Sequence, residues 1–301
     1  MSDSVHWPQK TRELSHNHFD STFWNDFPFR DDDIIVSTYA KSGTTWVQQI
    51  LSQLIFNGAE DVNVAELALW VDFRLPPQDV MRQMLEAQEH RRFIKTHLPV
   101  DALNYSPKAK YLYIARDGRD VVWSYYNHHS NHTPDIFEAL NAVIGPDLEP
   151  FKPADLDVHE YFRRWLDRDG YPLWSFWENI ASWWAVRDLP NLMLLHFSEL
   201  KADMPGQIRK MAEFLEIPID ESNWDTIVEH CTFDYMKENA VQSAPLGGVF
   251  WEGGAKTFIN KGTNGRWRDV LTEGDNAKYE AVALEKLGPE CAHWLKTGEK
   301  A

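Results

Sequence analysis

The sequence has few cysteines and none of the cysteine patterns typical of small disulfide-bonded secreted domains or of metal-binding domains. Only two cysteines occur among 301 residues, Cys231 and Cys291, and their spacing matches neither a metal site nor a redox motif. A disulfide framework or a zinc site is therefore not expected. The chain also lacks a Pro/Gly/Ser-rich linker, a low-complexity tract and an internal repeat. This favours a single domain over residues 1–301.

Long apolar runs and a basic leader are missing as well. No stretch approaches the length of a membrane span, and the first residues lack the basic and apolar regions of a signal peptide. Positive charge is scarce, because 30 basic against 46 acidic residues give a net charge of −16. That charge argues against nucleic acid or an anionic membrane as a partner. We therefore expect a cytoplasmic protein that binds any anionic ligand in a local cationic pocket.

Four short runs are almost wholly apolar, which is typical of strands that are buried on both faces. They occupy residues 34–38, 93–96, 111–115 and 192–196. Helical spacing of apolar residues predicts helices at 44–56, 117–127, 173–184, 205–214, 223–230 and 275–287. Strands that alternate with helices predict an α/β fold, with a central parallel sheet flanked by helices and ligands beyond the carboxyl ends of its strands. Residues 131–156 contain Pro and Gly and are expected to form an irregular insertion.

The loop after the first predicted strand is the most informative segment of the chain. Residues 37–46 read STYAKSGTTW and lead directly into a predicted helix. Free amides at a helix N-terminus, the helix dipole and nearby hydroxyls form an anion site, to which Lys41 adds a mobile cation. The loop is P-loop-like, but a Walker A motif has an early Gly and a Gly directly before its Lys. We therefore predict a site for a phosphate or sulfate group rather than for magnesium-bound ATP.

Polar residues also follow the next two predicted strands. His97 comes after one strand, and its usual pKa of about 6.5 lets a neutral imidazole accept a proton near neutral pH. Arg116 follows the other strand, and its guanidinium fork suits a phosphate. Ser124 lies two helical turns further on, so it can face the same ligand as Arg116. Three polar clusters at one edge of the sheet predict an active site.

Four motifs together resemble those of the cytosolic sulfotransferase family. This family moves a sulfuryl group from 3′-phosphoadenosine 5′-phosphosulfate (PAPS) to a hydroxyl or amine. The motifs are YAKSGTTW at 39–46, KTHLP at 95–99, YIARDGRDVVWSYY at 113–126 and KGTNGRW at 261–267. The resemblance extends from about Phe19 to Leu287. It implies a P-loop-like α/β sulfotransferase that uses PAPS, releases adenosine 3′,5′-bisphosphate (PAP) and needs no metal.

The resemblance also assigns roles to residues. It implies that Lys41 neutralises the departing 5′-phosphate, that Lys95 stabilises the transferred group and that His97 is the general base. Ser124 is implied to hold the 3′-phosphate and to engage Lys41 before the acceptor binds. The implied donor-binding residues are Lys41, Ser42, Gly43, Thr44, Thr45, Trp46, Arg116, Ser124, Phe197, Phe233, Lys261 and Gly262.

The implied acceptor pocket is aromatic, which favours a phenol or a hydrophobic alcohol. A phenol, with a pKa near 10, loses its proton more readily than an aliphatic alcohol. The residues that correspond to the pocket are Trp70, Phe73, Phe137, Phe250 and Trp251. His128, His129 and His132 have the spacing of metal ligands on a helix, but no carboxylate or cysteine partner is apparent nearby. We expect them to form a polar rim near the acceptor mouth.

Two further interpretations concern packing. The tryptophans that crowd into residues 165–184 are expected to pack in the core, with walls of an acceptor pocket as the alternative. Arg119 and Asp120 are expected to form a surface pair.

The sequence departs from the family pattern at several positions. Asn260 replaces an arginine of the implied 3′-phosphate clamp, and the lost charge-assisted bond is expected to cost about 1.5–3 kcal/mol unless another group replaces it. Ala40 stands where Pro is usual, and Arg266 where Asp is usual. A short dimer motif found in many animal relatives is lost at two of its four key positions, so the oligomeric state stays open.

Two alternative functions remain. One is a small-molecule kinase with a related phosphate loop, which the missing Walker glycine and the lack of a magnesium-binding carboxylate pattern argue against. The other is a nucleotide-binding protein that has lost catalysis. Asn260 favours this second alternative, whereas Lys41, Lys95, His97 and Ser124 oppose it.

Overall fold

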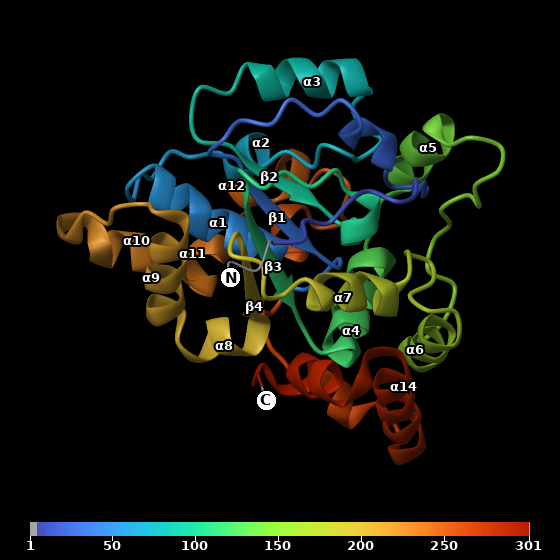
Figure 1. Cartoon of the computed structure of the whole chain (residues 1–301). Helices are drawn as coiled ribbons and strands as arrows, with labels where there is room; N and C mark the ends of the chain where they lie inside the picture. The colour runs from blue at the N-terminus through green and yellow to red at the C-terminus, as the bar shows by residue number, and fades with distance from the viewer. Residues whose placement is uncertain (1–4, 301) are drawn as a thin grey trace.

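A four-stranded parallel sheet forms the centre of the computed structural model, which describes residues 5–300 (Figure 1). Its strands are β1 (Ile34–Thr38), β2 (Phe93–Thr96), β3 (Lys110–Ala115) and β4 (Leu192–His196). Their order is β2-β1-β3-β4, and each strand is parallel to its neighbours. The predicted strands and the parallel α/β sheet are therefore confirmed, with β3 beginning one residue earlier than expected.

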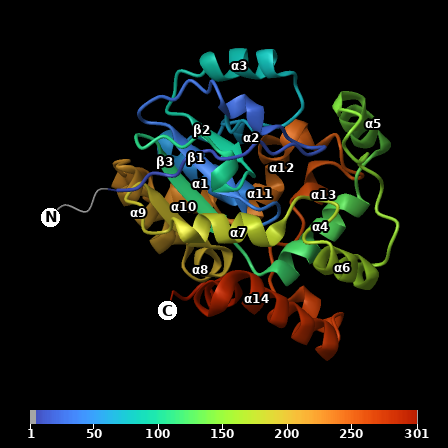
Figure 2. The same ribbon diagram turned by 45° about the vertical axis from the view of Figure 1, so that its right-hand side comes forward.

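Alternate residues of each strand supply two separate cores, one on each face of the sheet. On one face, Ile35, Tyr111 and Tyr113 join the larger aromatic core. Three of the helices that cover this face are α4 (Gly118–Ser130), α7 (Phe176–Ala185) and α14 (Glu273–Thr297). In Figure 2, α7 crosses in front of the sheet, and α14 lies below α7 and packs against it.

The opposite face of the sheet packs against aliphatic helices. Val36, Leu112 and Ile114 point into this second core. It is covered by α1 (Thr44–Ile55), α9 (Met204–Leu215) and α10 (Trp224–His230). Because both faces are covered, β1 is buried throughout and each other strand has only one partly buried residue, in line with their mostly apolar character.

Shorter helices connect these layers and surround the carboxyl edge of the sheet. They are α2 (Val64–Leu67), α3 (Gln78–Glu86), α5 (Pro134–Val143), α6 (Val158–Asp167), α8 (Phe197–Ala202), α11 (Phe233–Glu238), α12 (Ala240–Ser243) and α13 (Ala255–Phe258). Within residues 5–300, no helix combines the length and the hydropathy needed to cross a bilayer. The predicted helix over 173–184 begins later, at Phe176, because Ser175 caps it by accepting a hydrogen bond from the Glu178 amide.

The segment over 131–156 is not irregular throughout, as was expected. Its first half forms α5, which begins with Pro134 after the extended residue Thr133. Ile136, Phe137 and Leu140 share one face of this helix and pack with Phe151 from the second half of the segment. A small hydrophobic cluster therefore gives the segment a structure of its own, which its Pro and Gly content concealed.

The expectation of a surface pair at Arg119 and Asp120 is wrong. Arg119 is only 2% exposed, and its Nη2 lies 2.7 Å from Oδ2 of Asp117. Asp120 is buried too, and its Oδ1 accepts a hydrogen bond from the Gly265 amide at 2.7 Å. The chain segments that cover the start of α4 bury both residues, and this contact ties the loop before Arg266 to the sheet edge.

Candidate active site

The three predicted polar clusters meet at the carboxyl edge of the sheet. β1, β2 and β3 end side by side, and the loops that follow them touch through two hydrogen bonds. Arg116 Nη1 donates to the carbonyl of Lys41 at 3.3 Å, and His97 Nδ1 donates to the carbonyl of Thr38 at 2.5 Å. The clusters after the first three strands thus form one site.

The loop between β1 and α1 has the backbone of an anion cradle. Lys41 and Gly43 both have positive φ, at 65° and 117°. A Cβ at Gly43 would lie only 2.9 Å from Ile114 Cδ1, so the site requires glycine. The first backbone hydrogen bonds of α1 are those from the amides of Trp46 and Val47 to the Gly43 carbonyl. The amides at the start of the helix, before Trp46, are therefore available to a ligand. The buried Ser42 hydroxyl has no hydrogen-bond partner among the described residues.

Lys41 extends across the site to α4. Its Nζ lies 3.2 Å from Nδ1 of His128 and 4.9 Å from the centre of the Phe258 ring. Burial, aided by the charges of Lys95 and Arg116, lowers the pKa of Lys41 to about 7. Among residues 5–300, no hydrogen bond joins Lys41 to Ser124, which lies one turn before His128 on the same helix. The structure therefore pairs the loop lysine with a histidine that sequence reasoning placed elsewhere.

Arg116 is held by neutral groups rather than by a carboxylate. Its guanidinium donates to the Thr263 carbonyl at 2.9 Å and to Oδ1 of Asn264 at 3.0 Å. It also lies 4.2 Å from the centre of the Phe197 ring. The side chain is almost fully buried, and this burial lowers its pKa to about 10. Arg116 thus links the end of β3 to the loop that contains the KGTNGRW motif.

The residues predicted to contact adenine form two groups beside this loop. Trp46 packs edge-on against Phe197 at 5.5 Å and donates its indole N–H to the Cys231 carbonyl. Phe233 is 37% exposed, which is unusual for a large aromatic ring, and a Cβ at Gly262 would come within 2.8 Å of it. The ring and the glycine backbone therefore form an open flat surface. Lys261 is exposed next to this surface.

His97 is fixed in one tautomer. Because a carbonyl can only accept, its Nδ1 carries the hydrogen that bonds to Thr38, and Nε2 is left as an acceptor. The backbone is held too, since Asn179 Nδ2 donates to the His97 carbonyl at 2.9 Å. Burial, together with the charges of Lys95 and Lys41, holds the pKa of His97 well below its ordinary value. The neutral form of the imidazole is therefore favoured.

Lys95 and His97 share a contact with one tryptophan. Lys95 Nζ lies 4.2 Å from the centre of the Trp70 ring, and the His97 ring meets the same indole edge-on at 4.7 Å. Burial lowers the pKa of Lys95 to about 8. Lys95 and His97, two residues apart in the chain, therefore face the same indole.

The residues predicted to form the acceptor pocket lie close to these groups. Trp70 and Phe73 stack at 4.5 Å, and Phe73 and Phe250 pack against the cluster that contains Phe137. Trp251 lies 4.9 Å from His128, ring centre to ring centre. Aromatic rings from α5, the loop after α2 and the loop before α13 therefore surround one side of the site.

Three residues at the site, Trp174, His18 and Asp72, were not singled out from the sequence. Trp174 packs 5.3 Å from His97 and 6.3 Å from His18, so one of the crowded tryptophans does line the site. Trp165, Trp177 and Trp183, by contrast, lie in the core as expected. The third missed residue is Asp72, a buried carboxylate between Trp70 and Phe73. No motif or spacing in the sequence distinguishes these three.

The three histidines of α4 and its C-terminus form an inner wall rather than a polar rim. His128 contacts Lys41, His129 bonds to the Tyr161 hydroxyl and the Lys152 carbonyl, and His132 packs 5.5 Å from Trp251. Burial is the main cause that lowers the pKa of all three. Within residues 5–300, no group of three or more His, Cys, Asp or Glu side chains is placed to hold a metal ion.

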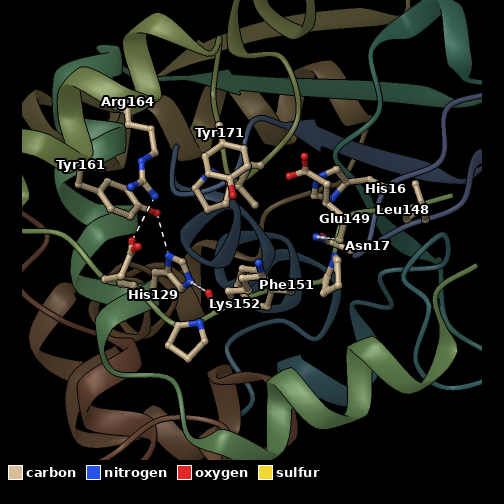
Figure 3. Close-up of a pocket in the computed structure, with 16 residues that line it drawn as sticks. His16, Asn17, His129, Leu148, Glu149, Phe151, Lys152, Tyr161, Arg164 and Tyr171 are labelled. Atoms are coloured by element: carbon tan, nitrogen blue, oxygen red, sulfur yellow. Dashed lines mark hydrogen bonds and ion pairs between the residues drawn. The ribbon is translucent and has the colours of Figure 1, made fainter. Parts of the chain in front are cut away.

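A cavity of about 440 Å³ lies beyond this wall (Figure 3). Its lining is partly polar and includes His16, His129, Tyr161, Arg164 and Tyr171. None of the five predicted acceptor residues lines this cavity. The wall that it shares with the aromatic side of the site includes Phe151, which stacks on His129 at 4.9 Å.

Comparisons with known proteins show the family and the fold of this chain. The family described as "Sulfotransferase domain" matches residues 31–289. The glycolipid sulfotransferase of Mycobacterium tuberculosis is 28% identical over 93% of each chain, and human sulfotransferase 1C2 is 28% identical over 87% of this chain and 85% of its own. Mouse sulfotransferase SULT7A1, solved with PAP, shares the fold with a TM-score of 0.69 at 22% identity, covering 91% of this chain and 92% of its own.

Proposed function

The chain belongs to the sulfotransferase domain family, and on that premise we propose that it transfers a sulfuryl group from PAPS to the hydroxyl or amine of a small acceptor. The acceptor class that we propose is a phenol or another hydrophobic alcohol. Similar proteins include a glycolipid sulfotransferase and a retinol dehydratase solved with androsterone and with retinol, and these molecules all carry large apolar parts.

One observation carries the proposal: three cations, Arg116 buried and Lys41 and Lys95 half-buried, converge without a direct ion pair. Among residues 5–300, no carboxylate oxygen lies within 4.0 Å of the charged nitrogens of Lys41, Lys95 or Arg116. Burial lowers the pKa of each, which means that the charged form of each side chain is disfavoured by its surroundings. In a chain of net charge −16, such a cluster is best explained by an anionic ligand with several charges.

The proposed donor fits the groups that surround these cations. The Ser42 hydroxyl lacks a partner, and the first amides of α1 are free, so both suit the 5′-phosphate. Arg116 is proposed to hold the 3′-phosphate, together with Ser124 and the Lys261-Gly262 backbone. The rings of Trp46, Phe197 and Phe233 are proposed to hold the adenine. Thr44 and Thr45 supply further donors at the 5′-phosphate.

The transfer step assigns a task to each remaining group. A bond forms between the acceptor oxygen and sulfur, while the bond from sulfur to the bridging oxygen breaks and leaves its electron pair on the 5′-phosphate. Lys41 neutralises that oxygen, and Lys95 offsets charge on the transferred group. The acceptor proton moves to Nε2 of His97, and the resulting imidazolium keeps its hydrogen bond to Thr38. An anionic donor near the two lysines would make His97 more basic.

Binding and turnover test the proposal together. We expect calorimetry to give strong binding of PAP and much weaker binding of ADP with magnesium, and we expect PAPS to sulfate a simple phenol. Preference for magnesium-ADP would instead favour the kinase alternative. Binding of PAP with no turnover over a broad acceptor screen would favour the inactive nucleotide-binding alternative.

A further inference from the structure

Asp72 is a buried carboxylate at the centre of the acceptor side of the site. It is 2% exposed and follows Trp70, which bridges to Lys95 at the edge of the sheet. Its oxygens accept three hydrogen bonds, from Trp24 Nε1 at 2.7 Å, from Trp70 Nε1 at 2.5 Å and from Thr96 Oγ1 at 2.5 Å. All three donors are uncharged, so the carboxylate has no direct ion pair.

Two of these donors adjoin the catalytic residues proposed above. The Trp70 ring is the surface that both Lys95 Nζ and the His97 ring contact, at 4.2 and 4.7 Å. Thr96 lies between Lys95 and His97 in the chain. The third donor, Trp24, packs with Phe27 in the aromatic core. Asp72 therefore connects the core to both proposed catalytic side chains.

We propose that Asp72 is the positioning residue of the His97–Lys95 pair. Its carboxylate fixes the plane of the Trp70 indole and the side chain of Thr96, and its negative charge keeps Lys95 protonated. The inference rests on the proposed function and adds a residue that does not itself touch the reacting atoms. It also explains why a carboxylate is tolerated in an aromatic environment, where an unpartnered charge is costly.

The charges around the pair support this assignment. Burial raises the pKa of Asp72 to about 6, so the group is ionised near neutral pH, while its hydrogen bonds and Lys95 oppose the rise. Asp72 in turn opposes the burial that lowers the pKa of Lys95. The other titratable groups that face Lys95 are His97, Lys41 and His128, and none of them supplies negative charge. Removing the Asp72 charge therefore lowers the pKa of Lys95 further.

Asp72→Asn tests the proposal, because it keeps the shape and removes the charge. With PAPS and a simple phenol, we expect kcat to fall about tenfold or more and the alkaline limb of the pH–kcat profile to move to lower pH by about one unit. The Kd for PAP is expected to stay within about twofold, since Asp72 lies on the acceptor side. Trp24→Phe is the matched control, because it removes one hydrogen bond to Asp72 but keeps the charge. The alkaline limb of its pH–kcat profile is expected not to move.

A fall in thermal stability with kcat and the pH profile unchanged would mean that Asp72 is only structural, and it would overturn the inference. If Asp72→Asn does not fold, Thr96→Val gives a second test, because it removes a donor and leaves the charge. We expect a lower kcat with an unshifted limb, and an unchanged kcat overturns the positioning role. Wild-type protein that binds no PAP would refute the proposed function instead, so the two failures are distinguishable.

Discussion

The donor half and the acceptor half of the site use different physical means. Around the donor loop, recognition relies on backbone amides, a glycine with positive φ and buried cations, all carried by short contiguous motifs. Around His97, the walls are aromatic and histidine side chains drawn from many separate segments. On the proposed function, the donor would be bound largely by backbone geometry and the acceptor by side chains that substitution can exchange.

The sharpest way to separate the two halves is His97→Ala. We expect kcat to fall about 10²- to 10⁴-fold, because a general base of this kind contributes that much. The Kd for PAP, measured by calorimetry, is expected to stay unchanged, since no proposed donor contact involves the imidazole. A parallel loss of PAP binding would contradict the separation of the two halves.

Asn260→Arg sharpens the description of the donor half. Restoring the cation that the family carries is expected to tighten PAP binding about ten- to a hundredfold, in line with about 1.5–3 kcal/mol for a charge-assisted bond. Adenosine 5′-phosphate, which lacks the 3′-phosphate, serves as the control ligand and is expected to bind as before. Equal gains for both ligands would mean that residue 260 does not face the 3′-phosphate.

A pH titration of PAP binding probes the buried cations directly. The pKa of Lys41 is lowered to about 7 and that of Lys95 to about 8, and an anionic ligand raises both. Binding above about pH 7 therefore takes up protons, so the affinity is expected to fall about tenfold or more per pH unit between about pH 7 and 8.5. Calorimetry in buffers of different ionisation enthalpy measures the uptake. No uptake in this range would contradict the lowered lysine pKa values.

The smallest expected effect comes from the acceptor wall. Phe137→Leu changes the shape of the aromatic cluster while keeping it apolar, so we expect the KM for an aromatic acceptor to change about two- to fivefold. The Kd for PAP is expected to be unaffected, as α5 contributes no proposed donor contact. Val143→Ala, at an exposed position on the same helix, is the control for changes in α5 alone. A shift in PAP affinity on Phe137→Leu would show that the halves are coupled.

The fold and the donor half could be predicted from the sequence because each of their parts is local. A strand buried on both faces is continuously apolar, and an anion loop after a strand needs only a few adjacent residues to be recognised. The loop over 37–46 and Arg116 lie where this reasoning puts them. The predicted link from Ser124 to Lys41 is not local, and the structure pairs Lys41 with His128.

The acceptor half could be predicted only in part, because its contacts join distant segments. Trp174 reaches His97 across more than seventy residues of sequence. The residues around Asp72 in the sequence do not indicate which groups donate hydrogen bonds to it. Two of its three donors, Trp24 and Thr96, come from other segments. The helix α5 is stabilised by the packing of Ile136, Phe137 and Leu140 against Phe151. The Pro and Gly content of the segment did not indicate this contact.

The hydrogen bond from His97 to the Thr38 carbonyl limits how the chain can change in length. Thr38 is the last residue of β1, and the loop that carries Lys41 begins directly after it. The short stretch of backbone from Thr38 to Lys41 therefore sets the distance between His97, the proposed proton acceptor, and Lys41. An inserted or deleted residue between Thr38 and Gly43 would alter that distance, so we expect this short stretch to tolerate exchange of side chains but no indels.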